Sequence, residues 1–280
     1  MFVSLIFAAA LTFTDAHAAK AYSCASTLVE RHSPRDAGTV RSKIASNWIL
    51  DTASAAGLNV RRDSFTVKMP QGRRRLTNLV AELKVSEDAP WIVLVSHYDT
   101  KTGVDCPGAN DGASTSGLLI AIGEMLGSWR GKELPKANVM LVWTDGEECI
   151  SSYEENDGLW GSRHAVAGLQ RRGAKVNAAI CLDMLGDEDL EISIPLNCDE
   201  SLAAKVVKAA DGCDVTVKRF NGRITDDHVP FLEAGYPAVD LIDFEYSFWH
   251  TPEDTMEHVK EESLAKSGRL VAALLCDLMQ

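Results

Sequence analysis

The sequence predicts a single α/β domain, built as a three-layer α/β/α sandwich with a central, mainly parallel, mixed sheet. Short apolar segments rich in β-branched residues, which are typical of buried strands, alternate with longer segments whose apolar residues have helical spacing. A helix between two consecutive strands allows those strands to pair in parallel. Because no linker rich in proline, glycine or serine divides the 280 residues, we expect one domain over residues 19–280.

The first residues of the chain have the features of a secretory signal peptide. Met1–Phe13 is apolar but too short to cross a bilayer comfortably, and Ala16-His-Ala18 matches an A-x-A cleavage pattern. We therefore predict that residues 1–18 are a signal peptide and that the mature protein is exported to the periplasm or the extracellular space. No basic residue precedes Lys20, which leaves a buried N-terminal helix as the alternative.

The first half of the domain is expected to contain a helix, a hairpin and a buried strand. Residues 35–56 have helical spacing and end before a glycine, a typical C-cap. Residues 59–68 and 77–85 are strand-like and joined by a Pro-Gln-Gly-Arg turn, which is typical of a hairpin at a sheet edge. The apolar segment Trp91–Ser96 predicts a buried strand that ends at His97.

The rest of the chain continues the alternation of helices and strands. A helix is predicted over residues 113–129, which begin with small side chains, and an apolar strand over residues 137–143. The same criteria predict helices over residues 162–172, 200–210, 226–234 and 261–279, and strands over residues 178–182, 215–219 and 238–242.

The composition excludes several classes of partner and site. A net charge of −12 repels phosphate backbones, so nucleic acid is not expected to bind, and the one basic cluster, Arg73–Arg75, is expected at a solvated hairpin tip. Beyond the N-terminus, no segment is apolar for long enough to cross a membrane. The seven cysteines contain no CxxC pattern, which argues against a thiolate zinc site. Cys198 and Cys213 are the nearest candidates for a disulfide, and the odd count leaves at least one free thiol.

Two adjacent carboxylates, Glu147 and Glu148, follow the strand predicted at residues 137–143. Open α/β sheets bind ligands beyond the carboxyl ends of their strands, so this pair lies where chemistry is expected. Neighbouring glutamates at a strand exit point in different directions, so one can bind a metal ion while the other stays free to carry a proton. A Glu-Glu pair alone is more often a solvated loop, and the rest of the chain decides between these interpretations.

Other predicted strands and loops also present potential metal ligands. His97 and Asp183 end two strands, His250 lies in the loop after the last strand, and small residues around Asp111 allow close approach to a metal. Imidazoles and carboxylates form the usual N/O ligand set of zinc. Asp99, two residues after His97, is expected to face the same side and hold its imidazole. Each residue alone has an ordinary structural role, but their joint position predicts a metal site. The patterns HExxH, GxSxG, GxGxxG and the P-loop are absent.

These polar strand ends belong to five longer motifs: Ser96-His-Tyr-Asp-Thr100, Gly108-Ala-Asn-Asp-Gly-Ala113, Asp145-Gly-Glu-Glu148, Leu182-Asp-Met184 and Trp249-His-Thr-Pro-Glu-Asp254. The motifs and their order resemble the M28 metallopeptidase family, which contains di-zinc aminopeptidases and the animal-type glutaminyl cyclases. The resemblance covers about residues 35–280. It implies the fold of the zinc aminopeptidases.

The resemblance to M28 aminopeptidases implies two zinc ions whose ligand sets share one aspartate. Glu147 would then be the general base that activates a water molecule. The implied ligands are His97, Asp111 and Asp183 for one ion, and Asp111, Glu148 and His250 for the other.

The finer resemblance favours the glutaminyl-cyclase branch. Asp157–His164 is similar to a cyclase loop that leads into a helix, Asp226–Leu232 to a DDHIPFL segment, and Trp249-His-Thr251 to a WHT motif. It implies one zinc ion on Asp111, Glu148 and His250, Glu147 as proton shuttle, Asp183 and Asp226 as acidic hydrogen-bonding partners, and Trp249 as a wall of the substrate pocket.

Two departures separate this chain from the animal cyclases. Asp240 stands where they carry a histidine, and residues 108–113 read GANDGA where theirs are similar to GATDSA. The second departure leans toward the aminopeptidases.

The resemblance therefore predicts an acyltransferase that converts the N-terminal glutamine of peptides or proteins into pyroglutamate and releases ammonia. Because His97 and Asp183 are both present, a di-zinc aminopeptidase remains the alternative. An inactive M28-like binding domain is a more remote alternative, because such domains lose metal ligands and none is lost here.

Overall fold

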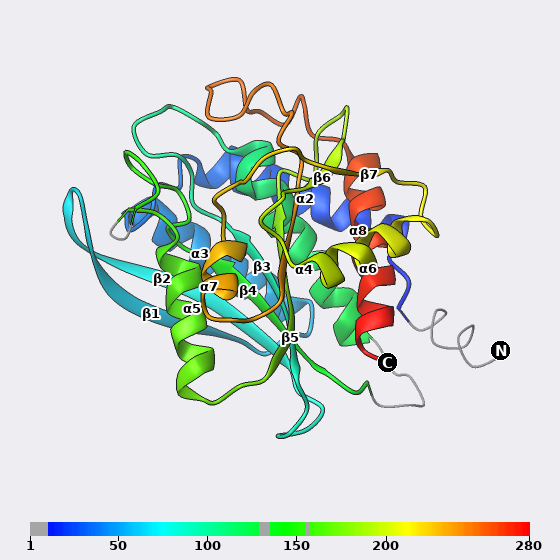
Figure 1. Cartoon of the computed structure of the whole chain (residues 1–280). Coiled ribbons are helices and arrows are strands. Elements are labelled where there is room, and N and C mark those ends of the chain that lie inside the picture. Colours follow the sequence, from blue (N-terminus) through cyan, green and yellow to red (C-terminus); the bar gives the residue numbers. More distant parts are fainter. Residues whose placement is uncertain (1–10, 129–134, 155–156) are drawn as a thin grey trace.

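The computed structural model describes residues 11–128, 135–154 and 157–280, and it confirms the predicted three-layer arrangement (Figure 1). Within these residues an eight-stranded mixed sheet has the strand order β1-β2-β4-β3-β5-β8-β6-β7. The strands are β1 (Val60–Met69), β2 (Gly72–Leu83), β3 (Trp91–His97), β4 (Asn138–Thr144), β5 (Val176–Asp183), β6 (Ile192–Ile194), β7 (Val217–Arg219) and β8 (Ala238–Ile242).

The central strands β4, β3, β5 and β8 run parallel, so their carboxyl ends meet at one edge of the sheet. The register aligns these ends closely, because His97 pairs with Thr144 and Asp183 pairs with Ile242. Polar side chains that end neighbouring strands are therefore brought together.

Most side chains of the central strands are apolar because helices cover both faces of these strands. Along β3, Ile92 and Leu94 pack into one core cluster, whereas Val93 and Val95 pack into a second cluster on the opposite face. The second cluster contains residues of α5 (Trp160–Arg171) and α7 (His228–Glu233), which lie in front of the sheet in Figure 1.

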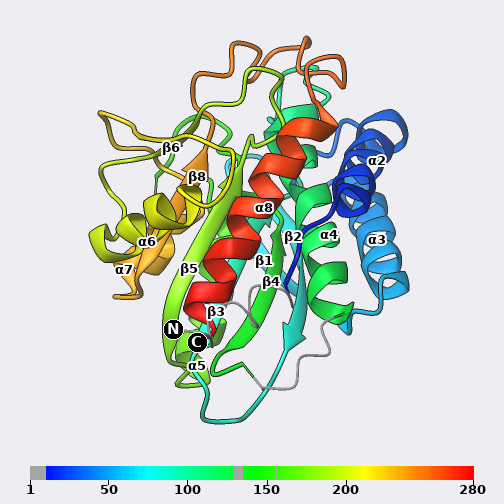
Figure 2. The same cartoon turned by 90° about the vertical axis from the view of Figure 1, so that its right-hand side faces the viewer.

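The larger layer of helices covers the other face, and Figure 2 shows α8 and α4 lying across it. Its helices are α2 (Asp15–His32), α3 (Val40–Ala55), α4 (Thr115–Ser128), α6 (Glu200–Ala210) and α8 (Glu261–Leu278), with a short π-helical turn, η1 (Ala109–Ser114), leading into α4.

The structure differs from the sequence predictions in a few local features. The helix predicted over residues 35–56 corresponds to α3, which begins at Val40. The hydroxyl of Thr39 accepts the N–H of Ser42 and so caps this helix. The hairpin lies at the sheet edge as predicted, but Arg73–Arg75 form part of β2 rather than a loop. Strand β6 was missed, since three residues are too few to show a period.

Cys198 and Cys213, the nearest candidates for a disulfide, are not joined. All seven cysteines lie in the described part of the chain, and all are free thiols. Cys198 is buried, and its Sγ accepts the backbone N–H of Asp240 at 3.3 Å. Cys213 lies beyond the far end of α6, whose eleven residues span about 16 Å and stand between the two cysteines in the chain.

Residues 11–18 pack against the body of the domain. Leu11, Phe13 and Ala18 belong to the main core cluster, and Thr14 caps α2 by accepting the N–H of His17. The ring of Phe13 lies on α8 at Gly268, where an added Cβ would meet the ring at 2.3 Å. The predicted cleavage position after Ala18 thus falls inside α2, while residues 1–10 lie outside the described residues. The signal peptide stays a prediction.

None of the helices described here is long and apolar enough to cross a membrane.

In a chain that retains residue 13, we expect Phe13→Ala to lower the free energy of unfolding by about 3 kcal/mol. The reason is that the ring is buried in the main core cluster and packs against α8 at Gly268. Urea denaturation measures the change. The neighbouring Thr12 is exposed, so Thr12→Ala serves as the matched control and should change stability little. Equal stability of the two variants would show that this segment is dispensable and that cleavage after Ala18 is compatible with the fold.

Candidate active site

The residues predicted as metal ligands meet at the carboxyl edge of the central strands. His97 ends β3, Asp183 ends β5, and Glu148 follows β4 within four residues of its end. The other two residues come from outside the strands. Asp111 lies in the π-helical turn η1, and His250 lies in the loop after β8. The structure thus brings together residues that are far apart in the sequence, as the sequence predicted.

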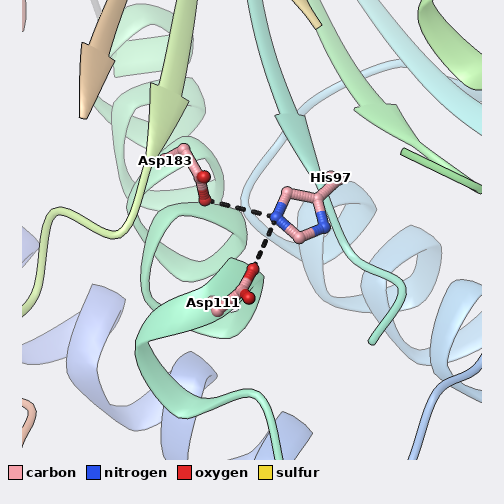
Figure 3. A group of neighbouring side chains, drawn as sticks. All are labelled: His97, Asp111 and Asp183. Atoms are coloured by element: carbon pink, nitrogen blue, oxygen red, sulfur yellow. Dashed lines mark hydrogen bonds and ion pairs between the residues drawn. The ribbon is translucent and has the colours of Figure 1, made fainter. Parts of the chain in front are cut away.

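A first group of ligand atoms surrounds the imidazole of His97. Its Nε2 lies 3.1 Å from Oδ1 of Asp111 and 3.2 Å from Oδ1 of Asp183, so both carboxylates face the same nitrogen (Figure 3). Burial alone would lower the pKa of His97, but the contacts with Asp111 and Asp183 outweigh it and raise that pKa well above its usual value. The group therefore concentrates negative charge around one point.

A second group shares Asp111 with the first. Nε2 of His250 lies 3.1 Å from Oε1 of Glu148 and 3.5 Å from Oδ2 of Asp111. In each group the potential ligand atoms all lie within 4.8 Å of one another. One carboxylate therefore stands between two potential metal positions, with one of its oxygens toward each imidazole.

The donor set fits a divalent metal ion. Among its members, Oδ2 of Asp111 and Oε2 of Glu148 are buried without a hydrogen-bond partner, although Lys101 Nζ approaches the second of these at 3.5 Å. Buried polar atoms are normally hydrogen-bonded, and buried charges are normally paired or bound to metals. Mixed imidazole and carboxylate ligands at such spacing suit a cation with an open coordination position.

Glu147 belongs to neither group, although it adjoins both. Its Oε1 accepts a hydrogen bond from the hydroxyl of Tyr153 at 2.8 Å. Burial, together with the charges of Asp226 and Glu148, raises the pKa of the Glu147 carboxyl well above its usual value. The division predicted for the two glutamates, with one among the potential ligands and the other free, is present in the geometry.

Asp99 has a different set of contacts from the one we predicted. Its Oδ1 lies 3.8 Å from Nδ1 of His97, which is too long for a hydrogen bond. The carboxylate instead accepts three backbone N–H groups, those of Gly146 at 2.8 Å, Glu147 at 3.1 Å and Glu148 at 3.2 Å. Asp99 therefore fixes the turn that carries the two glutamates, and it also faces Nδ1 of His97, the ring nitrogen that points away from Asp111 and Asp183.

Asp254 fixes the loop of Asp111 in a similar way. It accepts the backbone N–H groups of Asn110 at 2.8 Å and Asp111 at 3.2 Å, and the hydroxyl of Tyr246 at 2.7 Å. The small residue that follows Asp111 is also required, because a Cβ on Gly112 would lie 2.6 Å from the carbonyl oxygen of His97. These contacts explain why Asp111 can approach the imidazole of His97.

A cavity of about 230 Å³ opens beside the two groups. The indole of Trp249 is 39% exposed and stacks on the imidazole of His250 with ring centroids 4.0 Å apart. Asp226 lies in the wall, and burial together with the charge of Asp183 raises the pKa of its carboxyl to about 6. The walls are formed by Asp111, Glu147, Glu148, Tyr153, Asp183, Met184, Arg223, Ile224, Thr225, Asp226, Ile242, Phe244, Trp249 and His250.

The sequence did not identify Tyr153, Phe244 or Arg223 as residues of this cavity. All three lie outside the strands and helices, where no periodicity reports which way a side chain points. For Tyr153 the available signal was its position five residues after Glu148, inside the same exit loop.

Comparison with known proteins agrees with this geometry. The sequence pattern of Peptidase family M28 matches residues 78–275. The glutaminyl-peptide cyclotransferase of Drosophila melanogaster is 28% identical over 85% of this chain and 76% of its own. The crystal structure of a glutaminyl cyclase from an Acidobacteriales bacterium is 30% identical, covers 94% of both chains and has a TM-score of 0.85.

A leucine aminopeptidase precursor from Bacteroides thetaiotaomicron has a TM-score of 0.83 over 96% of this chain and 98% of its own, but its 24% identity shows the fold alone. With a family pattern that spans most of the chain and with cyclases among its similar structures, this chain belongs to Peptidase family M28, in the glutaminyl-cyclase-like branch.

Proposed function

We propose that this chain is a zinc-dependent glutaminyl-peptide cyclotransferase, which converts the N-terminal glutamine of peptides into pyroglutamate with release of ammonia. One observation carries the proposal: Glu147 stands free of the potential metal ligands yet faces the same cavity as Asp111, Glu148 and His250. A proton carrier beside a metal site is what an acyl transfer to an amine needs. The 30% identity to a bacterial glutaminyl cyclase supports the same reaction.

In this proposal Asp111, Glu148 and His250 hold the zinc ion, since their ligand atoms face one another at the edge of the cavity. Bound there, zinc supplies a Lewis acid that polarises the γ-carbonyl group of the glutamine side chain. The carboxylates of this group also keep the surroundings anionic, which attracts the amino terminus of a peptide.

The remaining steps belong to the residues of the chain. The α-amine of the substrate attacks its own γ-carbonyl carbon, and the bond from that carbon to the amide nitrogen breaks. Glu147 takes the proton that the amine loses and gives it to the departing nitrogen, which leaves as ammonia. A carboxyl with a raised pKa suits both transfers, and the hydrogen bond from Tyr153 keeps it oriented toward the cavity.

The shape of the cavity favours ring closure. The exposed indole of Trp249 forms one wall, and Ile242 and Met184 add apolar surface beside the carboxylates. Holding the flexible glutamine side chain folded against these walls brings its amine and carbonyl groups together. The reaction consumes no water, so apolar walls do not hinder it.

A second candidate is a di-zinc aminopeptidase, and one specific observation favours it. The imidazole of His97 meets Asp111 and Asp183, so the residues of a second metal position are also assembled. In that reaction Glu147 would serve as the base for a water molecule, and the same cavity would hold the N-terminal side chain.

The two candidates are separated by their products. We expect Gln-Phe-Ala to lose about 17 Da as ammonia on incubation with the purified protein, because ring closure expels the amide nitrogen. Leu-Phe-Ala should remain intact, and mass spectrometry follows both peptides. Release of free leucine, with two metal ions bound per chain, would overturn the cyclase in favour of the aminopeptidase.

The roles of the adjacent glutamates can be tested separately. Glu147→Gln should lower kcat by roughly 100- to 10,000-fold with the metal content unchanged, because it removes the proton carrier alone. Glu148→Gln should lose the metal, as counted by elemental analysis. The exposed Glu154 lies in the same exit loop, and Glu154→Gln is the matched control that should keep both metal and activity. Loss of metal from Glu147→Gln would contradict its assignment as a base.

A further inference from the structure

We infer that Arg223 forms a carboxylate-binding subsite at the rim of the active-site cavity, so that the enzyme favours substrates with a carboxylate next to the N-terminal glutamine. The inference rests on the proposed cyclase function and adds a substrate class to it. It is drawn from the size of the cavity, the charges that line it, and the position of Arg223 within the loop that leads into α7.

The cavity admits only the end of a peptide. Its volume of about 230 Å³ lies below the roughly 300–1,000 Å³ of pockets that enclose a drug-sized ligand. An N-terminal glutamine would fill the space beside Glu147 and Trp249, so the second residue of the peptide must cross the rim. Groups on the rim therefore decide which second residues are accepted.

Arg223 differs in charge from the rest of the lining. Among the residues that line the cavity it is the only lysine or arginine, whereas five of the others are carboxylates. Arg223 is exposed, and no described residue forms an ion pair or hydrogen bond with its guanidinium. A carboxylate deeper in the cavity would be repelled by the acidic walls, so the rim is where an anionic group of the substrate can bind.

The backbone beside Arg223 is held firmly. The side-chain amide of Asn197 forms two hydrogen bonds with the backbone of Ile224. It donates to the carbonyl oxygen at 2.7 Å and accepts the N–H at 3.0 Å. Earlier in the loop, the ring of Phe220 packs edge-on against Phe244, with centroids 5.4 Å apart, and Phe244 itself lines the cavity. The backbone that carries the Arg223 side chain is therefore held in place at the rim of the cavity.

The chemistry of arginine defines the group that it would recognise. A guanidinium presents paired N–H donors that match the two oxygens of a carboxylate, and it stays charged at all relevant pH values. The carboxylate can come from an aspartate or glutamate side chain at the second position, or from the C-terminus of a dipeptide. A lysine at the second position would meet a like charge.

The test compares amide-capped Gln-Asp-Ala, Gln-Ala-Ala and Gln-Lys-Ala peptides, with ammonia release as the readout. We expect kcat/KM for the aspartate peptide to exceed that for the alanine peptide by roughly threefold to tenfold, and the lysine peptide to be the poorest. The difference should appear mainly in KM, because Arg223 would bind the second residue of the peptide and takes no part in the bond changes, and it should shrink at high salt. Gln-Ala with a free or an amidated C-terminus tests the second source of the carboxylate in the same way.

Arg223→Gln should remove the preference for the aspartate peptide, and Arg223→Glu should reverse it toward the lysine peptide. The matched control is Arg219→Gln, since Arg219 pairs with Glu200 at 2.6 Å and does not line the cavity, so the preference should persist. Equal kcat/KM for the three capped peptides, or a preference that survives in Arg223→Gln, overturns the inference and leaves the cyclase intact. Failure to release ammonia from every glutamine peptide overturns the proposed function instead.

Discussion

The geometry of the site depends on one buried carboxylate, that of Asp99, and the three backbone N–H groups that it accepts. Strand β4 ends at Thr144, and the amides of the three residues after Asp145 find their partner outside the sheet. Gly146 turns the chain with a φ of 83°, and Asp99 then binds the N–H groups of Gly146, Glu147 and Glu148. Because Asp99 follows β3 and the glutamates follow β4, this contact ties two parallel strand ends together. It also fixes the backbone from which both glutamate side chains reach the cavity.

The many buried acids of the site divide into two kinds by their partners. Asp99 and Asp254 each accept backbone N–H groups, which compensate their charge and hold the loops of Glu147 and Asp111. Asp111 and Glu148 each keep one buried oxygen without a hydrogen-bond partner. That oxygen of Asp111 faces the imidazole of His250, and that of Glu148 faces the amine of Lys101. The first kind holds the backbone of the loops in place, and the second presents its carboxylates at the potential metal positions. Buried charges need such partners, because an uncompensated buried carboxylate is unfavourable.

The sequence predicted the central strands and their polar ends because both leave a local pattern, an apolar β-branched run followed by a histidine or an acid. It could not predict the three backbone N–H groups that Asp99 accepts, because they belong to the irregular turn after β4, and the sequence has no periodicity there that reports which groups meet. Tyr153 and Arg223 were missed for a related reason, since they reach the cavity from irregular loops. The sequence also could not choose between one and two metal positions, and Asp111 shows why: the same carboxylate faces both imidazoles.

Asp240, which stands where the animal cyclases carry a histidine, is one more buried acid near the site. Asp240 is buried, its ligand atoms lie within 4.8 Å of Cys181 and Asp226, and Nδ1 of His228 lies 3.7 Å away. Burial, with the neighbouring charges of Asp226 and Asp183, raises the pKa of Asp240 well above its usual value. Both carboxyl oxygens of Asp240 are buried without a hydrogen-bond partner. Asp240 lies beside Asp226, which in turn adjoins Glu147. The change from an imidazole to a carboxyl therefore falls next to the acids that raise the pKa of Glu147, in surroundings where burial disfavours the charged form of the new side chain.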